Sequence, residues 1–389
     1  MLTNRINSLS ESITIAITTK AQELKAEGKD ILSFSAGEPD FGTPRVIKDA
    51  AIDAINNDFT KYTAVDGVPA LREAIVEKLK RDNGLTYAIN QVIANNGAKQ
   101  SLFNLFSVTL QEGDEVIIPA PYWVTYPELV RYCGADVVEI ETHDYDAFKI
   151  TPEQLKEAIT PKTRMLILTT PSNPTGSIYT KEELTALGKV LEGTDILVAS
   201  DEMYEKLTYE GTFTSCAAVS EDMFKRTITI NGLSKSVAMT GWRFGYMAAH
   251  DTALIKATKK LQSQSTSNIN SITQLAAIAG LDGSADKDIA MMREAFIERR
   301  DEAVKLMNEI DGLSVTKPDG AFYLFVNIKD ITNDSLTFSK DLLSEKLVAV
   351  VPGVAFGSEG YFRMSFATDI DTIRDGIARI AEFVKEFKA

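Results

Sequence analysis

The stretch Asn231-Gly232-Leu233-Ser234-Lys235-Ser236-Val237-Ala238-Met239-Thr240-Gly241-Trp242-Arg243-Phe244-Gly245 is the most informative part of the chain. A β-branched run at 227–230 precedes it and predicts a buried strand. Lys235 is therefore expected where this strand gives way to a loop, with Arg243 farther along the same loop. An amine held there beside a fixed cation can be partly desolvated, which lowers its pKa and makes it a Schiff-base nucleophile near neutral pH. The alternative is an ordinary solvated loop lysine.

Strands and helices alternate around this stretch and predict an α/β fold. The expected strands are short apolar runs at 92–94, 115–119, 137–140, 165–169, 196–200, 227–230 and 245–248. Helical patterns lie between many of them, for example at 70–81, 100–110 and 181–191. This alternation favours a mostly parallel sheet that helices cover on both faces, with functional groups gathered at the carboxyl ends of the strands.

The two ends of the chain follow a different, α+β pattern. Near the N-terminus we expect a helix at 9–28, a strand at 31–35 and a turn-rich loop at 36–41. Toward the C-terminus we expect helices at 252–281 and 284–311, a strand pair within 313–328, a helix at 336–347, strands at 351–353 and 362–366, and a final helix. A chain of 389 residues is too long for one compact core. We predict a large domain at 45–285 and a smaller one formed by 1–44 together with 286–389.

Composition limits the classes of partner. The chain has 41 Lys and Arg against 55 Asp and Glu, a net charge of −14, which opposes binding to nucleic acid or anionic membranes. A site for small dicarboxylates would need its own local cations. Cys133 and Cys216 are isolated, as are the two histidines, so neither a disulfide nor a metal site is expected. No segment is apolar enough for a signal peptide or a membrane span, which predicts a cytoplasmic protein.

Two features could bind a phosphate group. Residues 95–100, which include Gly97, Ala98 and Lys99, lie between a strand and a helix, where backbone amides can bind an anion. The alternative is a routine strand-to-helix turn. Arg243 offers a planar fork that matches phosphate geometry.

Other strand ends carry groups suited to a flat, nitrogen-containing ring. Asp201 directly follows an apolar strand and could pair with a protonated pyridine nitrogen, with the phenol of Tyr204 nearby, or it could cap a helix. Asn173 lies in a tight turn for which we predict a cis bond before Pro174. Trp123 could stack on the ring or lie in the core.

Arg363 alternates with apolar residues on a predicted strand, where it could clamp a carboxylate or face water from a sheet edge. A lysine, phosphate donors, a ring stacker, a pyridinium partner and a carboxylate clamp together indicate pyridoxal phosphate.

The chain resembles the class I aminotransferases of pyridoxal-phosphate fold type I, in the aspartate aminotransferase family of the bacterial subgroup. The resemblance runs nearly end to end. It is carried by SAGEPDF (35–41), KYTAVDGVPALREAI (61–75), NNGAKQSLFNLF (95–106), PAPYWVTYPE (119–128), PSNPTG (171–176), SDEMYE (200–205), NGLSKSVAMTGWRFGY (231–246), GAFYLF (320–325) and VVPGVAFG (350–357). It implies a large domain with a mostly parallel seven-stranded sheet and a smaller α+β domain.

The resemblance also implies roles for individual residues. Lys235 would form the Schiff base and then move the α-proton. The other groups implied to hold the cofactor are Asp201 at the pyridine nitrogen, Tyr204 and Asn173 at the ring oxygen, Trp123 against the ring, and Gly97, Ala98, Lys99 and Arg243 around the phosphate. Tyr62 would reach the phosphate in a neighbouring subunit, which implies a homodimer. For the substrate, Arg363 would bind the α-carboxylate with Asn173 and the backbone of Gly37.

Two departures from the family pattern bear on these roles. Many relatives carry Ser or Thr three residues before the lysine, where this chain has Gly232, so Ser234 or backbone amides would take over that phosphate contact. The second carboxylate of aspartate would fall to Lys99. Some relatives that also use prephenate carry a basic residue at the position of Ser10.

The predicted reaction is transfer of the amino group from L-aspartate to 2-oxoglutarate. Within the same fold, the alternatives are an aminotransferase for aromatic amino acids or alanine, and a C–S lyase. A pyridoxal-phosphate-binding regulator would need an appended DNA-binding module, for which no residues remain. A nucleotide-dependent enzyme is disfavoured because the chain has neither a G-x-G pair nor a G-K-[ST] loop.

Overall fold

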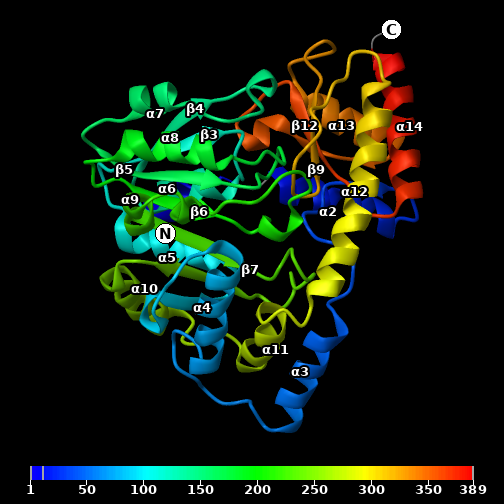
Figure 1. The fold of residues 1–389 in the computed structure, drawn as a ribbon. Helices are drawn as coiled ribbons and strands as arrows, with labels where there is room; N and C mark the ends of the chain where they lie inside the picture. The colour runs from blue at the N-terminus through cyan, green and yellow to red at the C-terminus, as the bar shows by residue number, and fades with distance from the viewer. Residues whose placement is uncertain (1, 11–12, 388–389) are drawn as a thin grey trace.

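The computed structural model describes residues 2–10 and 13–387 of the chain. Its centre is a seven-stranded sheet in the order β2-β8-β7-β6-β5-β3-β4 (Figure 1). The strands are β2 (Val92–Asn95), β3 (Glu115–Ala120), β4 (Asp136–Glu141), β5 (Thr163–Thr169), β6 (Leu197–Asp201), β7 (Thr227–Gly232) and β8 (Gly245–Ala249). Each lies where an apolar run predicted a strand, and the α/β fold with a mostly parallel sheet is confirmed.

The register of this sheet aligns the strand ends that carry polar groups. Of the seven described strands, only β8 is antiparallel to its neighbours, β2 and β7. In the parallel part, Thr169 at the end of β5 lies opposite Asp201 at the end of β6, and Asp201 lies opposite Ile230 of β7. The carboxyl ends of β5, β6 and β7 therefore meet at one edge of the sheet.

Both faces of the central sheet are apolar and covered by helices. Val116 and Ile118 of β3 belong to the core that includes α5 (Ala98–Thr109), whereas Ile117 belongs to the core beneath α8 (Lys181–Leu191). This two-sided burial explains why the parallel strands read as continuous apolar runs. The other helices of this part are α3 (Arg45–Asn56), α4 (Pro69–Asn83), α6 (Thr125–Tyr132), α7 (Pro152–Ala158), α9 (Glu221–Arg226), α10 (Thr252–Ser265) and α11 (Ser271–Leu281).

Segments from both ends of the chain build a second part. β11 (Val351–Pro352), β12 (Tyr361–Ser365) and β9 (Tyr323–Asn327) form a three-stranded antiparallel sheet with β12 in the middle. β1 (Leu32–Ser33), close to the N-terminus, pairs in parallel with β10 (Val348–Ala349). The helices here are α1 (Asn4–Asn7), α2 (Ile13–Ala26), α12 (Asp286–Asn308), α13 (Ser335–Lys346) and α14 (Ile370–Phe387).

The long helix α12 runs alongside both parts of the molecule, from the neighbourhood of α11 and α3 to that of α14 (Figure 1). The division into domains at 45–285 and at 1–44 with 286–389 stays a prediction.

Three predicted elements differ from the structure. The helix expected at 252–281 is interrupted at 266–270, where Ser267 adopts a φ of 59° and the side chain of Asn270 caps α11. Of the strand pair expected within 313–328, β9 forms, whereas Ser314 makes a single bridge to Asn327. The N-terminal helix spans 13–26 rather than 9–28, and residues 11–12 of that prediction lie outside the described residues.

Across the described ranges, no helix combines the length and the apolar character that crossing a membrane requires. Cys133 and Cys216 are both free thiols. The predicted cis bond between Asn173 and Pro174 is confirmed.

Candidate active site

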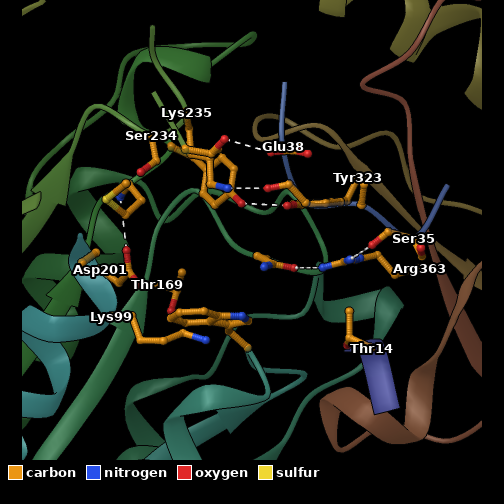
Figure 2. A pocket seen from close by; sticks show the side chains of 18 of the residues that line it. Thr14, Ser35, Glu38, Lys99, Thr169, Asp201, Ser234, Lys235, Tyr323 and Arg363 are labelled. Atoms are coloured by element: carbon orange, nitrogen blue, oxygen red, sulfur yellow. Dashed lines mark hydrogen bonds between the residues drawn. The ribbon is translucent and has the colours of Figure 1, made fainter. Parts of the chain in front are cut away.

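A cavity of about 460 Å³ lies at the carboxyl ends of β5 and β6, facing the part built from the chain ends. Figure 2 shows Lys235, Asp201, Lys99 and Arg363 around it. Most of the predicted site residues line it: Gly37, Ala98, Lys99, Trp123, Asn173, Asp201, Tyr204, Ser234, Lys235, Arg243 and Arg363. The fold thus gathers residues from nearly the whole length of the chain into one space.

Lys235 lies between β7 and β8 with its amine directed into the cavity. The Nζ atom donates a hydrogen bond to the carbonyl oxygen of Gly37. Burial, followed by the charge of Arg363, lowers the pKa of this amine from 10.5 to about 8, while Glu38 and Asp201 oppose the shift. The amine therefore loses its proton more readily than an ordinary lysine, as a nucleophile requires. The alternative of a solvated loop lysine is wrong.

Asp201 ends β6 as a buried carboxylate that is 5% exposed. The hydroxyl of Tyr126 donates to its Oδ2 at 2.7 Å, and the backbone N–H of Met203 donates to its Oδ1 at 3.2 Å. Burial raises the pKa of Asp201, and these hydrogen bonds oppose that rise. A cation placed beside this carboxylate would stabilise its charged form. The alternative role of capping a helix is wrong, because the next helical turn, Glu205–Leu207, has Tyr204 at its N-cap.

Two phenols meet beside the cavity. The hydroxyls of Tyr204 and Tyr323 lie 2.8 Å apart. Burial raises the pKa of both groups, so both keep their protons at neutral pH. One of the two protons is used in the hydrogen bond between the phenols, so the hydroxyl that accepts this bond can donate its own proton to an oxygen in the cavity.

Residues 95–98 comprise the end of β2, the turn after it and the first residue of α5. We call them the phosphate loop, because the sequence predicts that they bind a phosphate. Gly97 is the N-cap with a φ of 80°, and a Cβ there would lie 2.5 Å from Nη2 of Arg243. Arg243 is itself held by a 2.8 Å hydrogen bond from Nη1 to the carbonyl of Thr240. Backbone amides at a helix start and a guanidinium fork are the donors that a phosphate needs.

Gly232, the position at which this chain departs from the Ser or Thr of the family pattern, leaves little room for a side chain. A Cβ at this position would lie 2.7 Å from the carbonyl oxygen of Phe244, so a serine would not fit without a shift of the backbone. Ser234 is 6% exposed and lines the cavity. Its predicted contact with a phosphate stays a prediction.

Arg363 lies across the cavity and is 3% exposed. Its Nη1 donates to Oδ1 of Asn173 at 2.9 Å and its Nη2 donates to the carbonyl of Ser35 at 2.8 Å. Its Nε has no hydrogen-bond partner among the described residues. Because β12 is the middle strand of its sheet, the alternative of an edge arginine facing water is wrong.

Lys99 and Trp123 form the wall between the phosphate loop and α6. The amine of Lys99 lies 4.9 Å from the centre of the Trp123 ring. Burial, more than repulsion from Arg243, lowers the pKa of Lys99, although much of the side chain stays exposed at the cavity mouth. The Trp123 ring meets Tyr126 edge-on at 5.5 Å and borders the cavity, so it is partly a core residue and partly a cavity wall.

Two predicted site residues, Gly97 and Tyr62, do not line the cavity; Gly97 directly precedes Ala98, which does line it, whereas Tyr62 points elsewhere. Its side chain is 90% exposed, and it does not line the cavity of its own chain. This position is compatible with the expectation that it serves a neighbouring subunit, which stays a prediction.

The charge of the cavity is opposite to that of the whole chain. Among the described lining residues, four carry a positive charge and two a negative charge, although the chain as a whole has a net charge of −14. The cations are Lys99, Lys235, Arg243 and Arg363, and the acids are Glu38 and Asp201. These are the local cations that anionic ligands would need on an acidic protein.

Sequence reasoning missed Tyr126, Tyr323 and Glu38, which all line the cavity. Tyr126 could have been found, because it follows Trp123 by one helical turn in PAPYWVTYPE. Tyr323 and Glu38 occur within GAFYLF and SAGEPDF, but nothing in those letters indicates which side chain faces a cavity.

Comparison with known proteins identifies the family. The model of the family "Aminotransferase class I and II" matches residues 29–380. The chain is 48% identical over 391 residues to an aspartate aminotransferase of Bacillus subtilis, with 99% of each chain covered. It is 47% identical over 396 residues to an aspartate/prephenate aminotransferase of Nitrosomonas europaea, covering 98% of this chain and 99% of the relative.

The fold agrees with this similarity. The structure of the Thermus thermophilus aspartate aminotransferase with maleate superposes with a TM-score of 0.95 at 41% identity, covering 98% of this chain and 99% of the other. The family match spans most of the chain, including every predicted site residue. The chain therefore belongs to the class I and II aminotransferase family.

Proposed function

We propose that this protein is a pyridoxal-phosphate-dependent aspartate aminotransferase that transfers the amino group of L-aspartate to 2-oxoglutarate. The observation that carries the proposal is the buried amine of Lys235, which faces the same cavity as the carboxylate of Asp201 and the guanidinium of Arg363. The names of the relatives support the choice of aspartate.

The residues around the cavity fit pyridoxal phosphate. The buried carboxylate of Asp201 suits a ring nitrogen that carries a proton, and the phosphate loop with Arg243 suits the phosphate. The full set that would hold the cofactor is Gly97, Ala98, Lys99, Trp123, Asn173, Asp201, Tyr204, Ser234, Lys235 and Arg243, together with Tyr62 of a neighbouring subunit. When bound, the cofactor supplies an electron-poor ring that accepts charge from the substrate carbon.

The side chains of this protein would direct the proton transfers. The amine of Lys235 would accept the proton from Cα of the amino acid. Asp201 would hold a proton on the ring nitrogen throughout, supported by the hydrogen bond from Tyr126. Tyr204 and Asn173 would hold the ring oxygen and thereby fix the orientation of the ring.

The substrate would lie between Arg363 and Lys99. Arg363 would bind the α-carboxylate with Asn173 and the backbone of Gly37 as neighbours. Lys99 would bind the second carboxylate from the opposite wall. The Thermus thermophilus relative was solved with maleate, which is also a dicarboxylate, and this supports a dicarboxylate as the substrate.

Mixing the purified, cofactor-loaded protein with L-aspartate tests the proposal. We expect the absorbance of the bound cofactor to convert to that of the amine form, and 2-oxoglutarate to reverse the change. Lys235→Ala should lose the original absorbance and nearly all turnover. Retained transamination by that variant would contradict the assigned role of Lys235.

Lys99→Ala tests the substrate preference. We expect turnover of aspartate to fall by about tenfold or more relative to phenylalanine, because one charge-assisted contact to the second carboxylate is lost. The ratio of kcat/KM for the two amino acids, in wild type and variant, measures the effect. An unchanged ratio would leave Lys99 without this role, and a wild-type ratio that favours phenylalanine would reopen the aromatic alternative.

The same proposal includes the assembly and the setting of the enzyme. We infer a cytoplasmic homodimer in which Tyr62 of each subunit completes the site of the other. The 90% exposure of Tyr62 supports this arrangement.

A further inference from the structure

A buried polar network lies behind the phosphate loop, outside the cavity. Its centre is Gln262 of α10, which is fully buried. The Nε2 atom of Gln262 donates to the carbonyls of Val65 at 2.8 Å and Ala94 at 3.0 Å. Its Oε1 accepts from Nδ2 of Asn95 at 2.6 Å and of Asn104 at 3.1 Å. One amide thus makes all the hydrogen bonds available to it.

Asn95 connects this amide to the phosphate loop. It is the last residue of β2 and is fully buried. Its Oδ1 accepts from the hydroxyl of Ser101 in the first turns of α5 at 2.8 Å, and its carbonyl accepts from the N–H of Gly97 at 2.8 Å. Asn95 therefore holds the rest of the loop through its carbonyl. Gln262 and Ser101 in turn hold the side chain of Asn95 in place.

The other side of the network holds residues 59–68, which we call the Tyr62 segment. Gln262 binds it at the carbonyl of Val65. Gln274 of α11, also fully buried, donates to the hydroxyl of Thr63 at 2.8 Å and accepts from the N–H of Val68 at 2.8 Å. Gln262 therefore touches both the phosphate loop and the Tyr62 segment, whereas Gln274 touches the segment but not Asn95.

We propose that Gln262 is a positioning residue that holds the phosphate loop and the Tyr62 segment in a fixed relation to each other. The proposal rests on the proposed function in that the loop binds the cofactor phosphate and the segment reaches the neighbouring subunit. In each subunit, Gln262 would then support two sites. One is the phosphate site of its own chain, and the other is the site of the neighbouring subunit, which the Tyr62 segment reaches.

The chemistry of the network explains why an amide is needed at this position. Two carbonyls and two N–H groups converge on the side chain of Gln262, which is itself fully buried. A hydrocarbon would leave all four without a partner, and a carboxylate would leave both carbonyls without a donor. Buried polar groups left in this way move toward other partners, so the two attached segments would lose their common support.

Hydrogen exchange measured by mass spectrometry on the loaded enzyme tests the proposal. Gln262→Met preserves the approximate volume of the side chain but removes its hydrogen bonds, and we expect faster exchange in residues 59–68 and in residues 95–98. Gln274→Met is the matched control, a buried amide that holds only the Tyr62 segment, and should accelerate exchange in 59–68 alone. Gln262→Glu keeps the acceptor for Asn95 and should mainly affect 59–68.

Cofactor affinity gives a second readout. We expect Gln262→Met to weaken binding of pyridoxal phosphate by about tenfold and to move the ³¹P resonance of the bound phosphate, whereas Gln274→Met, which loosens only the Tyr62 segment, should have the smaller effect on both. Faster exchange spread equally over the chain, or confined to one of the two segments in Gln262→Met, would overturn the proposal. A wild-type protein that binds no cofactor would instead sink the proposed function, while the exchange pattern would still decide the role of Gln262.

Discussion

The charge on Lys235 affects both reactivity and stability, because the amine is buried beside arginines. Its pKa of about 8 lies below the ordinary value of 10.5, so between these pH values the unfolded chain binds more protons than the folded chain. Stability of the cofactor-free protein should therefore rise with pH across this window, and Lys235→Met should remove the contribution. Urea unfolding at stepped pH measures it. A difference between wild type and variant that stays constant from pH 8 upward would contradict the lowered pKa.

Tyr126 offers a way to weaken the hydrogen bonding of Asp201 without changing Asp201 itself. Tyr126→Phe removes the 2.7 Å hydrogen bond to Asp201 and leaves the one from Met203. A hydrogen bond to a charged group contributes about 1.5–3 kcal/mol, so we expect turnover to fall by about tenfold or more while the cofactor stays bound. Steady-state kinetics and the cofactor spectrum report the two effects. Tyr132→Phe, on the same helix, should keep wild-type turnover.

Gly97, at the start of α5, is a position where an added side chain should weaken cofactor binding. Gly97→Ala would place a side chain in the left-handed region and 2.5 Å from the Arg243 guanidinium. Gly113→Ala is the matched control, with a φ of 91° and no atom within 4 Å of the added carbon. Both should lose about 1 kcal/mol of stability, but only Gly97→Ala should weaken cofactor binding. Equal cofactor affinity in the two variants would show that the crowding at Arg243 has no effect.

The elements that could be predicted are those whose signal is local. Short apolar runs placed every strand of the central sheet, and Lys235 and Asp201 were found because each follows such a run. The break at 266–270 was missed although Ser267 and Asn270 belong to a cluster rich in Ser and Asn, the kind that forms loops and helix caps, because the helical pattern continues on both sides of it. Tyr323 reaches the site through the pairing of β9 with β12, a contact between distant segments that no local pattern encodes.

The whole assembly permits a test of the shared site. Lys235→Ala should be inactive, and Tyr62→Ala should bind the cofactor weakly. In a mixed dimer of the two variants, the chain with Lys235→Ala still supplies Tyr62 to a partner that retains Lys235. We therefore expect mixing under conditions that exchange subunits to restore part of the turnover at limiting cofactor. Turnover that never exceeds the sum of the separate variants would exclude an exchange of Tyr62 between subunits.

The antiparallel direction of β8 determines how the loop with Lys235 and Arg243 is held. The chain leaves β7 at Gly232 and enters β8 at Gly245, and these two residues are paired in the sheet. The loop between them carries Lys235 and Arg243, and it therefore starts and ends at neighbouring positions on the same edge of the sheet. A parallel β8 would instead have required a connection that crosses to the opposite edge. Arg363 belongs to a separate sheet. One wall of the cavity is thus anchored at both ends in the central sheet, whereas the Arg363 wall is anchored in another sheet and is joined to the first part by the hydrogen bond from Arg363 to Asn173.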